Sequence, residues 1–159
     1  MILVAMPEEI QLTNSNREDV VVTGVGALNV IKTLKNVDRK TPIINVGYAG
    51  SNTIKKGTWV KIGDVKTFHP NVTFDEPVFV LDGDTTCYTA GDFVTQTDIK
   101  EPCVFDMELA YILALGFTNV TSYKMVSDCL NINEFEDAIN EDIYKRGNEK
   151  LPNYIQTQI

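Results

Sequence analysis

The chain has 159 residues, 43% of them hydrophobic and 23% charged, and it carries a net charge of −8 at pH 7. This length fits one domain with its own core, and this charge disfavours nucleic acid and anionic membranes as partners because either would be repelled. No apolar run is long enough to cross a bilayer, and the apolar start of the chain lacks the basic flank of a signal peptide. The three cysteines share no metal-ligand spacing, so we expect reduced thiols in a cytoplasmic protein.

The first half of the chain alternates aliphatic segments with short turns. Strands are predicted at residues 2–5, 20–23 and 42–46, because each is a short apolar run bounded by polar or turn-forming residues. Pro7, Glu8 and Glu9 fit the first turn of a short helix, where proline is tolerated and acidic side chains complement the helix dipole. A carboxylate directly after a buried strand lies where open α/β sheets place their sites, although a surface acidic pair is the alternative.

Two segments of small residues follow the second and third of these strands. Gly24 and Gly26 stand between the second strand and a helix, as in a phosphate-binding turn, but the dinucleotide fingerprint requires a third glycine where Asn29 stands. These glycines therefore predict only a tight turn at which the backbone can approach a ligand. The helix that follows is predicted to bury the apolar face formed by Leu28, Ile31 and Leu34. Residues 47–51 are the second small-residue segment, and a turn is predicted there.

The middle of the chain is predicted to form strands at residues 58–62, 65–68 and 86–89. His69 is the only histidine and stands beside Pro70 in a predicted loop, so no histidine-based metal site is expected. The last strand is predicted at residues 120–126 and is followed by Ser127 and Asp128. A final helix is predicted over residues 131–148, and its apolar face is formed by Phe135, Ile139 and Ile143.

One carboxylate interrupts an otherwise apolar segment in the second half of the chain. Residues 107–117 are apolar at helical spacing except for Glu108, and no other charged residue occurs between Asp106 and Lys124. Burying an ionised carboxylate is costly, so Glu108 is expected either to find hydrogen-bond donors or to take part in chemistry. The alternative is a glutamate that only complements the dipole of its own helix.

The alternation of strands and helices predicts the fold class. No repeat, linker or low-complexity segment divides the sequence, so residues 1–159 are expected to form a single α/β domain. The predicted architecture is a three-layer α/β/α sandwich around a central mixed, mostly parallel sheet. In such folds the carboxyl ends of the strands gather at one edge, which would bring several turns and lone carboxylates together. These are Glu9, 24–26, 47–50, 91–93 and Asp128, and with Glu108 they predict one acidic pocket.

Seven short motifs occur along the chain in the order in which one protein family carries them. They are Ala5-Met6-Pro7-Glu8-Glu9, Thr23-Gly24-Val25-Gly26, Asn45-Val46-Gly47-Tyr48-Ala49-Gly50, Gly63-Asp64-Val65, Ala90-Gly91-Asp92-Phe93-Val94, Asp106-Met107-Glu108 and Val126-Ser127-Asp128. In these motifs the chain resembles the purine nucleoside phosphorylase superfamily, nearest its nucleosidase branch, which includes methylthioadenosine/S-adenosylhomocysteine nucleosidase. The chain is shorter than this family before Val20 and between Phe68 and Cys87. The resemblance implies a nucleoside phosphorylase-like fold, a small-molecule nucleoside as substrate, no cofactor or metal, and a homodimer.

The resemblance also implies roles for individual residues. Glu9 matches the carboxylate that activates the attacking water, and Asp128 matches the acid that protonates N7 of the leaving adenine. Glu108 matches the carboxylate that holds the ribose hydroxyls. Ser127, next to the predicted acid, completes this part of the predicted substrate site.

Other residues match positions that surround the substrate. Phe93 and Val94 fall where the family sandwiches the purine ring, and Met107 falls where a side chain lines the sugar and the base. Tyr48 and Lys124 fall near the attacking water, at positions where nucleosidases usually carry serine and arginine. Tyrosine is much bulkier than serine, and lysine keeps the charge of arginine but loses its planar fork.

These residue types suit cleavage of an N-glycosidic bond. The sugar passes through an oxocarbenium-like state, by analogy with O-glycosides, and adenine leaves readily only after an acid protonates it. A second carboxylate activates the incoming water on the other face of the sugar. The chain is therefore predicted to hydrolyse a purine nucleoside to free base and sugar. An adenine nucleoside such as methylthioadenosine or S-adenosylhomocysteine is the expected substrate.

Two alternatives to hydrolysis remain open. A purine nucleoside phosphorylase would use phosphate as the acceptor, but Arg17, Arg39 and Arg146 all lie outside the motifs. A catalytically weak nucleoside-binding protein is the second alternative, because Tyr48 and Lys124 depart from the nucleosidase pattern. Retention of the three carboxylates together favours hydrolysis over both.

Overall fold

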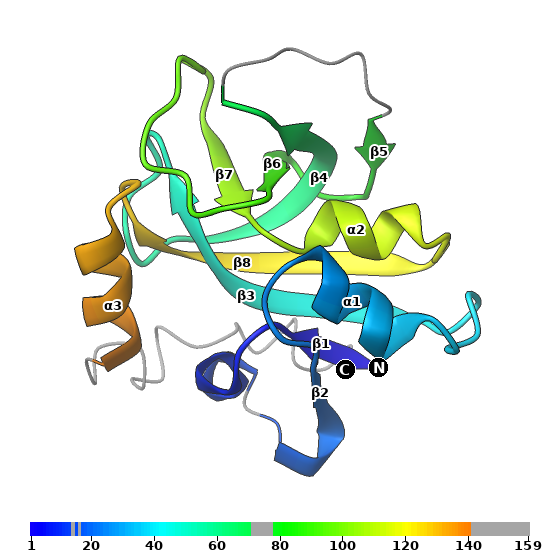
Figure 1. Ribbon diagram of the computed structural model, residues 1–159. Coiled ribbons are helices and arrows are strands. Elements are labelled where there is room, and N and C mark those ends of the chain that lie inside the picture. Colours follow the sequence, from blue (N-terminus) through cyan, green and yellow to red (C-terminus); the bar gives the residue numbers. More distant parts are fainter. Residues whose placement is uncertain (14, 16, 71–77, 141–159) are drawn as a thin grey trace.

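The computed structural model describes residues 1–13, 15, 17–70 and 78–140, and Figure 1 shows their arrangement. The strands are β1 (Ile2–Val4), β2 (Val20–Val22), β3 (Ile43–Ser51), β4 (Trp59–Phe68), β5 (Phe79–Val80), β6 (Thr85–Ala90), β7 (Cys103–Asp106) and β8 (Val120–Asp128). The helices are α1 (Ala27–Leu34), α2 (Leu109–Ala114) and α3 (Ile132–Asn140), and two short 3₁₀ helices are η1 (Pro7–Leu12) and η2 (Arg17–Asp19).

The strands belong to one mixed sheet that closes on itself. Their order is β2-β1-β3-β7-β6-β4-β5, and β8 pairs with both β3 and β4, so that β3, β7, β6, β4 and β8 form a ring. Of the eight strand pairs within the described residues, five are parallel and three are antiparallel. The prediction of an α/β fold with a mixed sheet is confirmed. The three-layer sandwich is not confirmed, because the strands curl into a ring where the sequence predicts an open central layer.

Strands β3 and β8 form a long parallel pair that crosses the molecule (Figure 1). The pair begins with Ile43 opposite Val120 and ends with Gly50 opposite Asp128, after a shift in register between Ala49 and Gly50. Both strands are buried along nearly their whole length, which agrees with their near-continuous runs of apolar and small residues. The shift in register is a local irregularity of the kind that changes the direction of side chains, and it lies near the ends of both strands.

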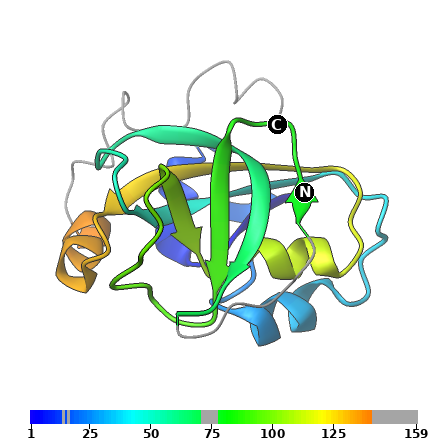
Figure 2. The same cartoon turned by 90° about the horizontal axis from the view of Figure 1, so that it is seen from above.

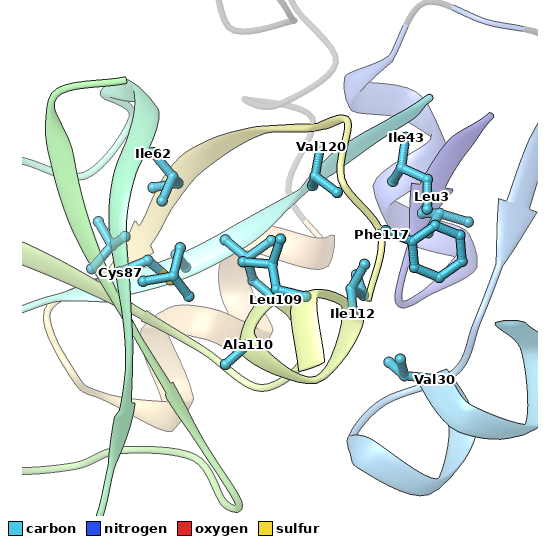
Figure 3. Packing of buried hydrophobic residues seen from close by; sticks show 14 of the residues in the cluster. Leu3, Val30, Ile43, Ile62, Cys87, Leu109, Ala110, Ile112, Phe117 and Val120 are labelled. Atoms are coloured by element: carbon cyan, nitrogen blue, oxygen red, sulfur yellow. The ribbon is translucent and has the colours of Figure 1, made fainter. Parts of the chain in front are cut away.

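The hydrophobic core has two parts, one on each side of the sheet at β1. Leu3 packs into the first part, and its neighbours Ile2 and Val4 pack into the second, because successive side chains of a strand point to opposite faces. Helices α1 and α2 lie side by side in both views and cover the first part (Figures 1 and 2). Figure 3 shows this part, in which side chains of both helices meet those of the strands. Leu12 of η1 and Ala138 of α3 belong to the second part.

The buried face of α1 differs from the predicted one. Leu28 and Ile31 are 82% and 42% exposed, whereas Val30 and Leu34 are fully buried. Val30 and Leu34 are four residues apart and therefore lie on one side of the helix. This helix has only eight residues and carries apolar side chains on both sides, so its spacing admits two faces. Packing against α2 and the sheet selects the face that contains Val30.

Other predicted elements also change. Residues 47–51 continue β3 instead of forming a turn, because they remain paired with β8 or β7. Strands β5 and β7 were not predicted, and the strands predicted at residues 58–62 and 65–68 are one continuous strand, β4. The helix predicted over residues 107–117 is limited to Leu109–Ala114. Of the final predicted helix, residues 141–148, including Ile143, lie outside the described residues. Within the described part of the chain, no helix is long and apolar enough to cross a membrane.

Candidate functional site

A cavity of about 130 Å³ lies where β1, β3, β7 and β8 end. Seven of the predicted site residues line it, namely Glu9, Tyr48, Phe93, Met107, Glu108, Ser127 and Asp128. Val94 lines a smaller cavity of about 30 Å³, which shares Phe93, Met107 and Asp128 with the larger one. Lys124 lines neither of these two cavities. The carboxyl ends of the strands thus bring together side chains that are far apart in the sequence.

Glu9 is held at the cavity by backbone groups from two parts of the chain. It belongs to η1, directly after β1, and it is only 3% exposed. Its Oε1 accepts hydrogen bonds from the N–H groups of Ala5 (2.8 Å) and Met6 (2.9 Å), and its Oε2 accepts one from Tyr48 (2.7 Å). Burial raises the pKa of Glu9, whereas the positive charge of Lys124 and these hydrogen bonds oppose the rise.

Two glycines of β3 leave the space that two carboxylates of the cavity occupy. A Cβ atom at Gly47 would lie 2.5 Å from Oε2 of Glu9, and a Cβ at Gly50 would lie 2.8 Å from Oδ2 of Asp128. Real Cβ atoms essentially never come so close to another atom. The small-residue segment of the sequence is therefore a strand whose glycines allow two acidic side chains to approach its backbone.

Asp128 is the last residue of β8 and is fully buried. Its Oδ1 accepts a hydrogen bond from the hydroxyl of Ser127 (2.7 Å), and its Oδ2 accepts one from the N–H of Leu130 (2.9 Å). Leu130 has a φ of 63°, in the left-handed region that side chains other than glycine rarely adopt. Burial raises the pKa of Asp128, whereas these hydrogen bonds and one from the backbone of Asn131 oppose the rise. The negative charge of Glu134 on α3 adds to it.

Glu108 occupies the N-cap position of α2, but its carboxylate does not cap that helix. Its Oε2 instead accepts a hydrogen bond from the N–H of Gly26, in the turn before α1, at 2.9 Å. Among the described residues no other hydrogen bond to this carboxylate occurs, so acceptor positions remain for a ligand. Burial and the charge of Asp106 raise the pKa of Glu108 to about 8, against the opposing charge of Lys124. This glutamate therefore does more than complement the dipole of its own helix.

Lys124 lies beneath the cavity and is 1% exposed. Its Nζ is 3.2 Å from Oδ2 of Asp106, which is buried as well. Burial is the largest single influence and would lower the pKa of Lys124, but the neighbouring acidic groups, of which Asp106 acts most strongly, together outweigh it. The pKa is therefore raised and the side chain is a buried cation. Neither Asp106 nor its hydrogen-bond partner Thr89 was predicted as a site residue.

Aromatic rings form an apolar wall of the cavity. The rings of Phe93 and Phe135 are 5.5 Å apart, and those of Tyr48 and Phe135 are 6.4 Å apart and meet edge to face. The sequence places Phe135 on the apolar face of the final helix, and that spacing is equally typical of a core residue. Phe105, another lining residue, lies on β7, which was not predicted.

The lining determines what the cavity can hold. Its polar side chains are carboxylates and hydroxyls, and no lysine, arginine or histidine is among the lining residues. An anionic group would therefore be repelled, whereas a flat ligand that donates hydrogen bonds would find acceptors and aromatic surfaces. Within the described residues, no group of three His, Cys, Asp or Glu side chains could hold a metal ion. Buried carboxylates with raised pKa values can exchange protons with a bound molecule near neutral pH.

Comparison with known proteins gives matches among solved structures alone, because no protein-family model and no curated protein matches the chain. The MTAN nucleosidase of Chlamydia trachomatis matches with a TM-score of 0.69 and 17% identity, over 89% of this chain and 87% of that one. The 5′-methylthioadenosine/S-adenosylhomocysteine nucleosidase of S. pneumoniae matches with a TM-score of 0.68 and 20% identity, over 94% and 93% of the two chains. Futalosine hydrolase of Helicobacter pylori matches with a TM-score of 0.64 and 14% identity, over 87% and 89%.

The chain therefore has the fold of these proteins. The resemblance indicated by the seven motifs is confirmed at the level of the fold, since the matching structures include methylthioadenosine/S-adenosylhomocysteine nucleosidases. A shared fold does not fix an activity, so the activity has to come from the residues of the cavity.

Proposed function

We propose that the chain is a nucleosidase, which hydrolyses the N-glycosidic bond of a purine nucleoside. The observation that carries this proposal is that Glu9 and Asp128 line one cavity and that both carboxylates accept hydrogen bonds from the protein. An ionised carboxylate offers about four acceptor positions, so each keeps room for water or substrate, and Glu9 has about one position left. The shared fold with nucleosidases supports the same activity.

Glu9 is the base in this proposal. Lys124 counteracts the effect of burial on the pKa of Glu9, which favours the ionised carboxylate. The remaining acceptor position of Glu9 suits one water molecule. As the sugar develops positive charge, this water attacks C1′ and gives its proton to the carboxylate.

Asp128 is the acid in this proposal. Burial and the charge of Glu134 raise the pKa of Asp128, and no positively charged side chain among the described residues opposes this rise. A proton retained by Asp128 passes to N7 of the purine while the electrons of the C1′–N bond move into the base. The base then leaves as a neutral molecule. Glu9 now holds the proton taken from water and Asp128 has lost its own, so exchange with solvent returns both groups to their starting states before the next turnover.

The rest of the cavity accounts for binding of a nucleoside. Glu108 has acceptor positions left for the two ribose hydroxyls, next to Met107. The rings of Phe93 and Phe135 offer apolar surfaces for the purine. An adenine nucleoside such as methylthioadenosine or S-adenosylhomocysteine is the proposed substrate, because N7 and the exocyclic amino group of adenine suit a neighbouring carboxyl group.

Water is the proposed acceptor in place of phosphate. Phosphate binding needs cationic side chains or helix N-termini, and the side chains that line this cavity are uncharged or acidic. Lys124 is the one buried cation among the described residues near the cavity, and it is already paired with Asp106. Phosphate would have to displace that pairing and approach three further carboxylates.

A homodimer and a cytoplasmic location are also proposed, from the resemblance and from the free thiols. Val25, Leu28 and Ile31 expose apolar side chains at the start of α1, and Val25 also lines the cavity, which supports a contact between two copies at this place. Analytical ultracentrifugation should give twice the mass of the chain, and Leu28→Glu should lower it. A monomer at every concentration would contradict the dimer without touching the proposed reaction.

The proposed reaction is tested with a panel of nucleosides. The protein is incubated with adenosine, inosine, methylthioadenosine and S-adenosylhomocysteine, with and without phosphate, and the products are separated by chromatography. We expect free adenine and free sugar at the same rate in both conditions, and no release by Glu9→Gln. Release that requires phosphate would identify a phosphorylase. Binding without release in the wild type would identify a nucleoside-binding protein.

A further inference from the structure

A second group of polar side chains extends from the wall of the cavity, where Asp106 lines it, into the protein, and the proposed reaction does not use it directly. Thr89, Asp106 and Lys124 are exposed by 1%, 6% and 1%. The hydroxyl of Thr89 donates to Oδ1 of Asp106 at 2.6 Å, and Oδ2 of Asp106 lies 3.2 Å from Nζ of Lys124. The three side chains come from the neighbouring strands β6 and β7 and from β8 on the other side of the ring. They form one continuous chain of contacts.

Strand register and the start of α2 fix this group. Thr89 and Asp106 are opposite each other in the parallel pair β6–β7, so their side chains meet on the same face. Oδ2 of Asp106 also accepts a hydrogen bond from the N–H of Leu109 (2.9 Å), and Oγ1 of Thr89 accepts one from Ala110 (3.0 Å). Two N–H groups at the beginning of α2, which have no partner inside the helix, thereby hold Thr89 and Asp106 in place.

The ammonium group of Lys124 lies on the same face of the sheet as the carboxylate of Glu9. Lys124 is opposite Gly47 in the pair β3–β8, and a Cβ at Gly47 would point at the Glu9 carboxylate. Residues opposite each other in a sheet direct their side chains to one face. The missing side chain of Gly47 therefore leaves Glu9 and Lys124 facing each other across β3 and β8.

The positive charge of Lys124 interacts with several acidic groups from different elements. The groups that act on the charge of Lys124 are Asp106 on β7, Cys87 on β6, Glu108 before α2 and Glu9 on η1. Burial keeps the thiol of Cys87 protonated by raising its pKa well above the ordinary value, so three carboxylates share the ammonium group. A buried ion pair contributes little net stability compared with apolar residues, so stability alone does not explain this arrangement.

We propose that Thr89 and Asp106 are positioning residues, which hold the ammonium group of Lys124 where its charge acts on Glu9 and Glu108 as well as on Asp106. The proposal rests on the proposed hydrolysis for its meaning, since Glu9 is the base of that reaction. Asp106 partly neutralises the positive charge of Lys124. Thr89 limits this neutralisation, because its hydrogen bond holds Oδ1 of Asp106 away from the lysine.

The proposal predicts opposite effects for two substitutions. Asp106→Asn removes the counterion, so more of the charge of Lys124 acts on Glu9 and Glu108, and both titrate lower by about one pH unit. Thr89→Val keeps the shape but removes the donor to Oδ1, so that Asp106 turns towards Lys124 and Glu9 titrates higher by about half a unit. Thr89→Ser keeps the hydroxyl and is the matched control, with titration as in the wild type.

Carbon-13 NMR of the glutamate side-chain carboxyl groups measures these titrations without substrate. The signals of Glu9 and Glu108 are assigned by Glu9→Gln and Glu108→Gln in the full chain, and the acidic limb of single-turnover adenine release is recorded beside them. We expect the low-pH limb to move down for Asp106→Asn, up for Thr89→Val and not at all for Thr89→Ser. Far-ultraviolet circular dichroism confirms that each variant is folded.

The two readouts separate this proposal from the proposed reaction. Opposite NMR shifts in a protein that never releases base would uphold the positioning and reject the nucleosidase. Base release with unchanged glutamate titrations in Asp106→Asn and Thr89→Val would overturn the positioning and leave the nucleosidase intact. If Asp106→Asn does not fold, Thr89→Val against Thr89→Ser still decides, because equal titration of Glu9 in these two variants overturns the proposal.

Discussion

Glu9 and Asp128 have similar hydrogen bonds but opposite electrostatic surroundings. Each lies on the wall of the same cavity, each is almost completely buried, and each accepts hydrogen bonds from the protein. The charge that acts on Glu9 is the cation Lys124, whereas the charge that acts on Asp128 is the anion Glu134. Two carboxylates in one cavity are thus distinguished by their charged neighbours.

This difference assigns the roles. Burial raises the pKa of both acids, but only Glu9 has a cation that favours its ionised form, so in the proposed reaction Glu9 suits the base and Asp128 the proton donor. The donors differ as well, because those of Glu9 come from separate parts of the chain, whereas those of Asp128 come from its immediate neighbours in sequence. The proposed base therefore depends on the tertiary fold for its hydrogen bonds, and the proposed acid depends on one local turn.

The largest effect is expected for Asp128→Asn, which removes the proposed acid and leaves Glu9 unchanged. Asparagine has nearly the shape of aspartate but no transferable proton, and general acid catalysis contributes about 10²–10⁴-fold. Single-turnover cleavage, measured with protein in excess, should fall by that factor, while calorimetry shows that the nucleoside still binds. Asp98→Asn, an exposed acid that does not line the cavity, is the control. Unchanged cleavage would remove Asp128 from the mechanism.

The next largest effect is expected for Gly47→Ala and Gly50→Ala, which test how closely the two carboxylates approach β3. The added methyl groups would lie 2.5 Å and 2.8 Å from carboxylate oxygens, and overpacking of this kind costs about 1–3 kcal/mol. Denaturant titration should show this loss of unfolding free energy in both variants. Gly91→Ala is the control, because nothing lies within 4 Å of its added methyl group. A Gly47→Ala variant as stable as Gly91→Ala would show that Glu9 does not need the space.

A smaller effect is expected in the pH dependence of stability, through Glu108. Its pKa is raised from 4.5 to about 8, so between these values the folded state keeps a proton that the unfolded state has lost. Stability therefore falls as the pH rises through this window, by at most about 1.4 kcal/mol per pH unit from this group. Urea titrations should show a shallower fall for Glu108→Gln, which can still accept the hydrogen bond from Gly26. Parallel curves for the two proteins would contradict the raised pKa.

The smallest effect is expected for Tyr48→Phe. The tyrosine hydroxyl accepts a hydrogen bond from Nε2 of Gln11 at 2.8 Å, and such a bond contributes about 1 kcal/mol. Stability should fall by about that amount, while cleavage persists, because the backbone N–H of Tyr48 still holds Glu9. Gln11→Ala, combined with Tyr48→Phe in a double-mutant cycle, measures the bond itself. A loss of cleavage far larger than the loss of stability would instead give the hydroxyl a role in placing the water.

The strands that the sequence predicts are those with a local signal. β1 and β2 are short aliphatic runs, and each is present close to its predicted place. β7 has four residues after a polar segment, too few to show an alternating pattern. Closure of the ring depends on β8 pairing with β4, for example Trp59 with Met125, and nothing local in either strand indicates that partner.

In the candidate site as well, some residues have a local sequence signal and others depend on the folded sheet. Glu9, Glu108 and Asp128 are recognisable because each is an acid at the end of an apolar segment, and the structure brings them to one cavity. Lys124 was expected to contact the substrate but lies beneath the cavity, because its register on β8 directs it towards Asp106. Thr89 is recognisable only through its register with Asp106, and that register is a property of the folded sheet.

The assignment of acid and base is tested most directly by changing the leaving group. p-Nitrophenyl riboside releases a phenolate that needs no protonation, so its cleavage requires the base but not the acid. The account predicts that Asp128→Asn cleaves this riboside at the wild-type rate although it no longer releases adenine, and that Glu9→Gln cleaves neither compound. Equal loss of both activities in Asp128→Asn, or cleavage of the riboside by Glu9→Gln, would contradict the account.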